Sequence, residues 1–304
     1  METELSASIA ELIDRLIQFN TFLLMLTMGL GLTFLKAFVL WQKPAQVVRA
    51  VAVAVVGVIV VAVAMSEGAA ALDLDVPLEA RLAVLLMAGA AGNALAPGLA
   101  AKIGANAAEA ISLMVTLSLA SIIAMPVIVA TALPSLPDGV EVSGGDVLSV
   151  VARNMLAPLF VGLAVRTFWV TAADLVTDTL TKISGVMLNV VVVVIILRDF
   201  DSIIDLGWVA VVFILVTLGL WLALGHFLGG AEKESRLLLA ANSSQRNGAI
   251  AMLVAIQGLD QAVPAIVATG VLALLVVVAY FSIVGKAMLG KSPSPETETE
   301  LEPS

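Results

Sequence analysis

The stretch LAANSSQRNGAIAMLVA, residues 239–255, decides the fold of this 304-residue chain. It begins and ends as an apolar helix, but six polar residues and a glycine stand in its middle, at 242–248. A charged side chain at the centre of a bilayer costs about 2.5–3.5 kcal/mol on insertion scales, so Arg246 is expected to have a function there. A helix can break at this depth only where the freed backbone is buried in protein or lines a cavity. The stretch therefore predicts a broken transmembrane helix.

A second interrupted apolar stretch, MAGAAGNALAPGLAAKIG, occupies residues 87–104. Glycines, a proline and Asn93 punctuate it. Two interrupted segments in corresponding positions of two halves are the best sequence indication of a transporter site. We predict that the two breaks, 93–98 and 242–248, cross near the centre of the membrane, because the unwound backbone of each needs polar groups around it.

The composition places the chain in a membrane and excludes several other classes. Hydrophobic residues make up 61% of the sequence and charged residues 13%, which a soluble domain of this length could not accommodate. There is no cysteine and one histidine, so we expect no metal site, and no motif calls for a cofactor. The net charge of −9 comes largely from termini and loops, and no basic patch indicates nucleic acid.

The apolar segments predict about nine spans, each near the roughly 20 residues that cross a bilayer. Their approximate limits are 17–34, 47–64, 78–103, 107–131, 147–169, 180–197, 207–228, 235–256 and 262–284. Residues 1–290 then form a single membrane transport domain. Residues 291–304, an acidic segment rich in Pro and Ser, are predicted to be disordered.

Lysine and arginine orient this array, because cytoplasmic loops carry an excess of them. With the N-terminus outside, ten basic residues fall on the cytoplasmic side and four near the external side. The cytoplasmic group is Lys36, Lys43, Arg49, Lys102, Arg166, Lys182, Lys233, Arg236, Lys286 and Lys291; the external group is Arg15, Arg81, Arg153 and Arg198. We predict a multi-pass protein of the cell (inner) membrane with its C-terminus in the cytoplasm.

Several stretches occur in an order and spacing that agree with one another. They are MLTMGLGLTF (25–34), QKP (42–44), the Gly/Asn/Pro break near Asn93, NAAEAISLMVTLSLASIIAMP (106–126) and RNGAIA (246–251). Together they resemble the bile acid:sodium symporter family. The resemblance implies two inverted repeats, about 17–131 and 147–286. It also implies two broken helices that cross in a core domain, which moves against a panel domain.

The resemblance further implies a set of sodium ligands, and this chain has lost most of them. Where the family has a Glu and, after three residues, Gln-Asn, the chain has Asn242, Arg246 and Asn247. Other ligand positions of the family fall on Val55, Ala96, Pro97, Ala110 and Met114. An amide in place of the carboxylate, with a guanidinium beside it, makes binding of a cation electrostatically unfavourable. We expect weak or absent sodium dependence, while sodium and a proton both stay open as coupling ions.

Glu109 stands near the start of the fourth span, close to where the resemblance implies the first sodium site. An unpaired buried charge is far more costly than a buried pair, so we expect Glu109 to pair with Arg246. Two interpretations are open. The pair replaces sodium as a structural element, or Arg246 holds the carboxylate of the substrate while Glu109 is released or protonated.

The other polar residues of the breaks are further candidates for binding substrate or ion. Asn93, Ser243, Ser244 and Gln245 fit this role, although side chains that satisfy the broken backbone, or tie helices together, would explain them nearly as well. We predict a secondary transporter that moves a small organic anion, bile-acid-like or a smaller carboxylate, across the bilayer by alternating access. Enzyme motifs such as His-Glu-x-x-His are absent. A channel or a membrane sensor with a transporter-like fold is the alternative.

Overall fold

The computed structural model of the chain describes residues 2–31, 39–92, 106–132, 145, 149–150 and 152–289. Within these ranges the regular elements are all helices and no strand occurs. The prediction of an all-α membrane protein is confirmed. The acidic segment 291–304, predicted to be disordered, lies outside the described residues.

Five helical stretches are long and apolar enough to cross a membrane. They are Pro44–Ala71, Glu109–Thr131, Val170–Arg198, Gly207–Leu228 and Asp260–Gly285. Each overlaps one of the predicted spans. The count of nine stays a prediction, because the other predicted spans are shorter, more polar or broken helices.

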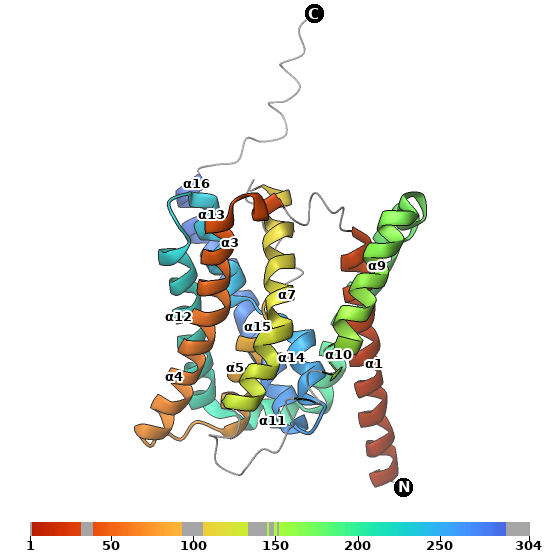
Figure 1. Cartoon of the computed structure of the whole chain (residues 1–304). Coiled ribbons are helices and arrows are strands. Elements are labelled where there is room, and N and C mark those ends of the chain that lie inside the picture. Colours follow the sequence, from red (N-terminus) through yellow and green to blue (C-terminus); the bar gives the residue numbers. More distant parts are fainter. Residues whose placement is uncertain are drawn as a thin grey trace, which may run out of the picture.

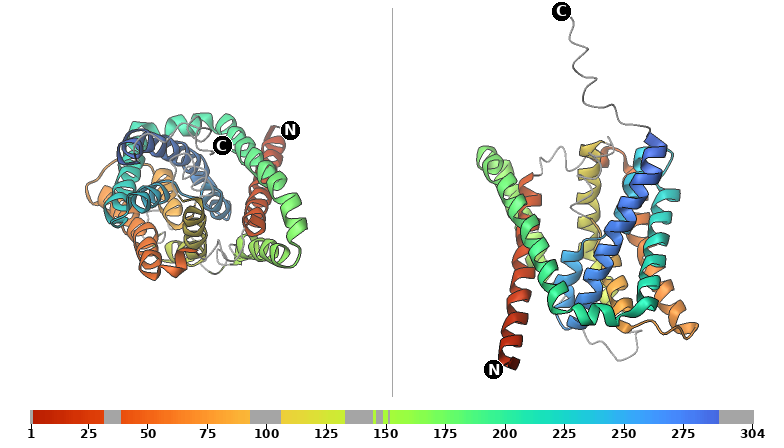
Figure 2. Two further views of the ribbon diagram at one scale, coloured as in Figure 1. Left: turned by 90° about the horizontal axis from the view of Figure 1, so that it is seen from above. Right: turned by 180° about the vertical axis from the view of Figure 1, so that it is seen from behind.

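Three helices stand together on one side of the molecule, and we call them the panel. They are α1 (Glu2–Gly31), α9 (Ala157–Phe168) with the π-helical turn η4 (Ala152–Leu156) before it, and α10 (Val170–Arg198). Helix α1 packs along both α9 and α10. Helices α1 and α9 stand on the right in Figure 1, while α10 begins beside them and runs to the core, where its end contacts α15 (Figure 2).

Two glycines bring the helices of the panel into close contact. A Cβ on Gly29 would lie 2.3 Å from the carbonyl oxygen of Leu159, and a Cβ on Gly162 would lie 2.3 Å from that of Leu26. No side chain fits at such distances, so α1 and α9 pack backbone against backbone. Small residues at membrane helix interfaces permit this approach, and the resulting contact holds the helices together where lipid supplies no hydrophobic force between them.

The other long helices form a second group, the core. They are α3 (Pro44–Val51), the π-helical turn η2 (Ala52–Gly57), α4 (Val58–Ala71), α5 (Leu78–Gly89), α7 (Ala107–Thr131), α12 (Gly207–Leu228), α13 (Lys233–Ser244), α14 (Gly248–Ala255) and α15 (Val263–Tyr280). The short elements are η1 (Val39–Gln42), α11 (Phe200–Asp205), η5 (Asp260–Ala262), η6 (Phe281–Gly285) and α16 (Lys286–Leu289).

Helix α5 lies at the centre of the core. Its residues from Ala80 to Gly89 are all buried, because α4, α7, α14 and α15 pack around it. Helix α10 is the opposite case. Its apolar side chains such as Leu175 and Leu197 are 79% and 74% exposed, as expected for a face that meets lipid. The short central helix and the long outer helix therefore have different surroundings although both are strongly apolar.

The structure describes the second predicted break and the residues directly before the first one. Helix α5 ends at Gly89 and the backbone is unwound at 90–92, where Gly92 has a φ of +84°. A Cβ on Gly92 would lie 2.6 Å from the backbone nitrogen of Ser118, so α7 leaves room for glycine alone. The second break is shorter than predicted and covers 245–247, between α13 and α14. Residues 93–98 of the first break, Asn93 included, lie outside the described residues.

The glycine contact of the panel gives a direct test. Gly162→Ala should destabilise the protein by about 1–3 kcal/mol, because the new methyl group has no space against α1. Gly185→Ala in α10 is the matched control, since nothing lies within 4 Å of its Cβ position. It should be neutral or stabilising by about 0.5–1 kcal/mol. The measurement is thermal unfolding in detergent, and equal stability of the two variants would contradict the close contact.

Candidate functional site

The two helix breaks are in direct contact. The backbone nitrogen of Asn247 donates to the carbonyl oxygen of Ala90 at 2.8 Å, and its side-chain Nδ2 donates to that of Gly92 at 3.3 Å. Helices α5 and α13 approach from opposite ends of the core, so their C-terminal ends face this contact (Figure 1). The predicted stretch 93–98 lies outside the described residues, so its crossing with 242–248 stays a prediction; the contact that the structure describes is made by the residues just before it, 90–92.

The guanidinium of Arg246 lies between the two breaks and is held by four carbonyl oxygens. Its Nε donates to Met87 at 3.1 Å and its Nη2 to Ala88 at 2.6 Å. Its Nη1 donates to Ala54 at 2.7 Å and to Asn242 at 3.2 Å. The side chain is fully enclosed, since the whole residue is 2% exposed.

Three of these carbonyls belong to helix ends. Met87 and Ala88 lie in the last turn of α5, and Asn242 lies in the last turn of α13. Carbonyl groups of a last turn have no intrahelical donor, and together they form the negative end of the helix dipole. The fourth, Ala54, lies in the π-helical turn η2, a geometry that departs from the α-helical ladder and is frequent at functional sites. Arg246 therefore caps two helices at once.

The predicted ion pair between Glu109 and Arg246 is wrong. Glu109 pairs with Lys43, with 2.7 Å between Nζ and Oε1, in a partly exposed position where the two side chains are 17% and 45% exposed. The hydrogen bond and the charge of Glu109 raise the pKa of Lys43. The pairing differs because Glu109 lies in the first turn of α7, beside the residue that precedes α3. The charge of Arg246 is compensated by backbone dipoles instead of a carboxylate.

Four polar side chains beside Arg246 have buried oxygen atoms without a hydrogen-bond partner in the described part of the chain. They are Oδ1 of Asn242, Oγ of Ser243, Oγ of Ser244 and Oε1 of Gln245. The residues are at most 7% exposed. Buried polar atoms are nearly always paired, so such a cluster marks a place where a ligand, ion or water completes the bonding. Asn247 differs, because its Oδ1 accepts from the backbone nitrogen of Ile250 and caps α14.

Polar residues outside the predicted set also converge on this region. Asn20 of α1 is 1% exposed and its Oδ1 has no partner among the described residues. The next residue, Thr21, donates to the carbonyl oxygen of Ala249 in α14 at 3.5 Å. Asn20 therefore belongs to the surface where the panel meets the core. In the sequence, the adjacent polar residues Asn20 and Thr21 in the apolar first span could have indicated this contact.

Helix α7 supports the first break from the other side. The Oγ of Ser121 donates to the carbonyl oxygen of Ala91 at 2.9 Å, and the Oγ of Ser118 to that of Gly92 at 3.5 Å. These two serines lie one turn apart on the helix face that meets the unwound backbone. They satisfy carbonyl groups that the broken helix can no longer pair.

A model of the sodium bile acid symporter family matches residues 19–206, which is more than half of the chain. The chain belongs to this family. Its long apolar helices and its membership together make it an integral membrane protein, and members of the family are transporters. Among curated proteins, none matches the chain. The family match ends at Leu206, before α12, so the break that contains Arg246 lies beyond it.

The carbonyl cage predicts a ranking of Arg246 variants. Arg246→Met should destabilise the protein by about 3 kcal/mol or more, because several buried carbonyls lose their donor at roughly 1–3 kcal/mol each. Arg246→Lys keeps the charge and three donors, so its loss should be smaller. Lys182→Gln, at an exposed position of α10, removes one positive charge elsewhere and should be neutral. Thermal unfolding in detergent gives the order, and equal losses for Met and Lys would contradict the cage.

The separation of Glu109 and Arg246 gives a second test. Glu109→Gln and Arg246→Lys should have additive effects on the free energy of unfolding, within about 0.5 kcal/mol, because the two residues share no partner. A coupling clearly larger than this would restore the rejected ion pair.

Proposed function

We propose that the protein is a secondary transporter for a small organic anion, and that it works by alternating access. The panel, α1 with α9 and α10, moves against the core around the crossed breaks. Family membership supports transport of bile acids or similar anions. The unpartnered oxygen atoms of Ser243, Ser244 and Gln245 beside Arg246 support a ligand site at the second break, and Asn20 adds one on the panel surface that meets the core.

The observation that carries the proposal is the cage of Arg246. Four backbone carbonyl oxygens surround its guanidinium, as oxygen atoms surround a metal cation. We infer that Arg246 is a fixed cation that does the electrostatic work of a bound sodium at this crossing. It neutralises the carbonyl dipoles and joins the two breaks, so the site needs no sodium to assemble.

The same geometry bears on the two interpretations of Arg246. A guanidinium has five N–H groups, and four of them are already bonded to carbonyls. This favours the structural role over a role as the main receptor of the substrate carboxylate. The anion is then recognised by the hydroxyl groups of Ser243 and Ser244, with the positive end of α14 beside them. A bile-acid-like molecule or a smaller carboxylate fits these donors.

We propose an orientation in the membrane from the distribution of basic residues. The end of the molecule that carries Lys43, Arg49 and Lys233 is placed in the cytoplasm of the cell, and the end where α1 begins is placed outside. In Figure 1 these are opposite ends, as an odd number of crossings requires.

Transport in proteoliposomes tests the proposal. A preloaded organic anion should accelerate uptake of its labelled form, and this counterflow should saturate. A carrier gives this result because its site faces one side at a time. Uptake should change little when sodium is replaced by choline. Flux without counterflow would indicate a channel, and absence of flux for every carboxylate tested would favour a sensor.

The fixed-cation role has its own test that needs no substrate. Arg246→Ala leaves a volume lined by four carbonyl oxygens, and rings of carbonyls can replace the hydration shell of an alkali cation. Sodium chloride should therefore raise the thermal stability of this variant more than choline chloride at equal ionic strength. The unchanged protein should show no such difference. A steep sodium requirement of the unchanged protein, in thermal stability or in uptake, would contradict the proposal that Arg246 replaces sodium.

A further inference from the structure

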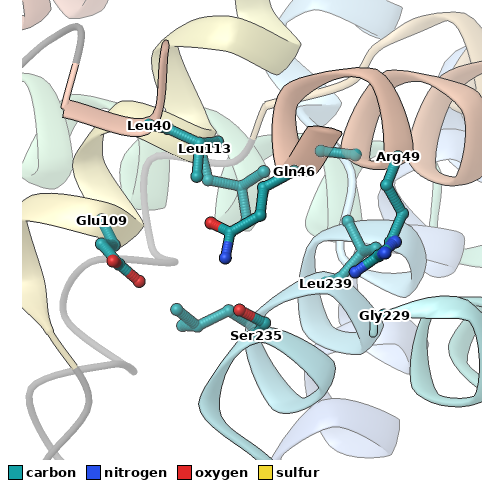
Figure 3. A pocket seen from close by; sticks show the side chains of 10 residues that line it. Leu40, Gln46, Arg49, Glu109, Leu113, Gly229, Ser235 and Leu239 are labelled. Atoms are coloured by element: carbon teal, nitrogen blue, oxygen red, sulfur yellow. The ribbon is translucent and has the colours of Figure 1, made fainter. Parts of the chain in front are cut away.

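A pocket lies at the end of the core where α3, α7 and α13 begin. It encloses about 380 Å³ of empty space, part of it open solvent. Leucines form much of its wall: Leu40, Leu113, Leu238 and Leu239. Figure 3 shows the amide of Gln46 pointing into the pocket, with Glu109 on one side and Arg49 on the other. None of its described lining residues belongs to the helix breaks, so it is separate from the site above.

Arg49 supplies a positive charge at the rim of this pocket. A Cβ on Gly230 would lie 2.1 Å from Nη1 of Arg49 and 3.2 Å from its Cζ. Gly230 has a φ of +102°, which suits glycine. The guanidinium of Arg49 lies directly against the backbone of this glycine, in the connection between α12 and α13.

The charge of Arg49 has no counter-ion in the described part of the chain. The nearby acid of the pocket, Glu109, is already paired with Lys43. The ion pairs among the described residues are otherwise Glu11 with Arg15, Asp174 with Arg166 and Asp199 with Arg198. Arg49 is exposed, and a guanidinium at the rim of a pocket that lacks an acid is a suitable partner for the oxygens of a carboxylate or phosphate.

Gln46 adds a second requirement. Its Oε1 is buried and has no donor among the described residues. A buried amide oxygen without a donor is unfavourable, so a ligand that offers a hydroxyl hydrogen would be bound more tightly than one that does not. The leucine wall accepts the apolar part of such a ligand.

We propose that this pocket binds a small oxyanion that also carries a hydroxyl group, such as a hydroxycarboxylate or a hydrogen phosphate. Arg49 pairs with the anionic oxygens, and the hydroxyl donates to Oε1 of Gln46. The phosphate of a lipid headgroup shares this chemistry and is a second source of the ligand. The site is independent of the proposed transport function, because it lies in the core alone and needs no movement of the panel.

The absence of cysteine makes the experiment simple. Ser235 lines the pocket, so Ser235→Cys places a single thiol there. The rate of its reaction with methyl methanethiosulfonate is measured on the full-length protein in detergent. The probes are glycolate, inorganic phosphate and a short-chain phosphatidic acid, at constant ionic strength. A ligand at ten times its Kd should slow the reaction about tenfold, because it leaves about one site in ten open.

Two comparisons make the result specific. Addition of Arg49→Gln should raise the ligand concentration that gives half-maximal protection about tenfold or more, as expected for the loss of a charge-assisted hydrogen bond. Addition of Lys182→Gln, which removes the same charge from an exposed position of α10, should leave protection unchanged. Ser202→Cys, in α11 outside the pocket, should show no protection by any probe.

Each outcome decides something. Protection by glycolate or phosphate assigns a soluble oxyanion, and protection by the phosphatidic acid alone assigns a lipid. No protection by any probe, or equal protection after Arg49→Gln, overturns the proposal. Because the assay requires no flux, a protein that fails to transport anions leaves this result untouched.

Discussion

The structure depends on a cation that is part of the chain. Two helices, α5 and α13, end inside the core, where the carbonyls of a last turn lack donors within the helix and unpaired groups are costly. The guanidinium of Arg246 donates four hydrogen bonds to backbone carbonyls at this place. Among the described residues it has no acid partner. The contact between Asn247 and Ala90 then joins the breaks directly. Without this side chain, carbonyl groups at the ends of both broken helices would lose their hydrogen-bond donor.

The division into panel and core follows from two different kinds of packing. In the panel, glycines let α1 and α9 meet backbone to backbone, so this pair behaves as one body. In the core, helix α5, buried from Ala80 to Gly89, is enclosed by α4, α7, α14 and α15. Contact between the two groups includes a hydrogen bond from Thr21 to Ala249 and the unpaired Asn20. Apolar side chains of the panel, such as Ile17, Met25 and Leu159, also pack in one hydrophobic cluster with residues of the core.

The positions where the chain departs from the family lie both inside and beyond the range that the family model matches. Residues 19–206 match the sodium bile acid symporter family, and this range includes most of the panel and the first break. Arg246 lies forty residues further on, in the segment that the match does not reach. Because Val55, Ala96, Pro97, Ala110 and Met114 lie inside the matched range, the replaced ligand positions are not confined to the second break.

Sequence predicted the parts of the site that residue types determine. Hydropathy located the spans, and the predicted span 207–228 coincides with α12. The cost of burying a charge singled out Arg246. Its partners were beyond reach, because Met87, Ala88 and Ala54 contribute backbone oxygens that any residue would offer. The π-helical turn in AVAVVG has no sequence signature of its own. The predicted partner of Glu109 was wrong because the sequence does not show that Lys43, just before α3, lies at the same level as the start of α7.

The covalent attachment of Arg246 has an electrical consequence for the proposed transporter. A sodium ion that enters with an organic anion also leaves with it, and the two charges cancel during the crossing. A guanidinium remains in the protein when the anion departs. One turnover then moves net negative charge, and a potential of 100 mV acts on one elementary charge with about 2.3 kcal/mol. In a cell with a negative interior, this electrogenic step opposes accumulation of the anion and drives its exit.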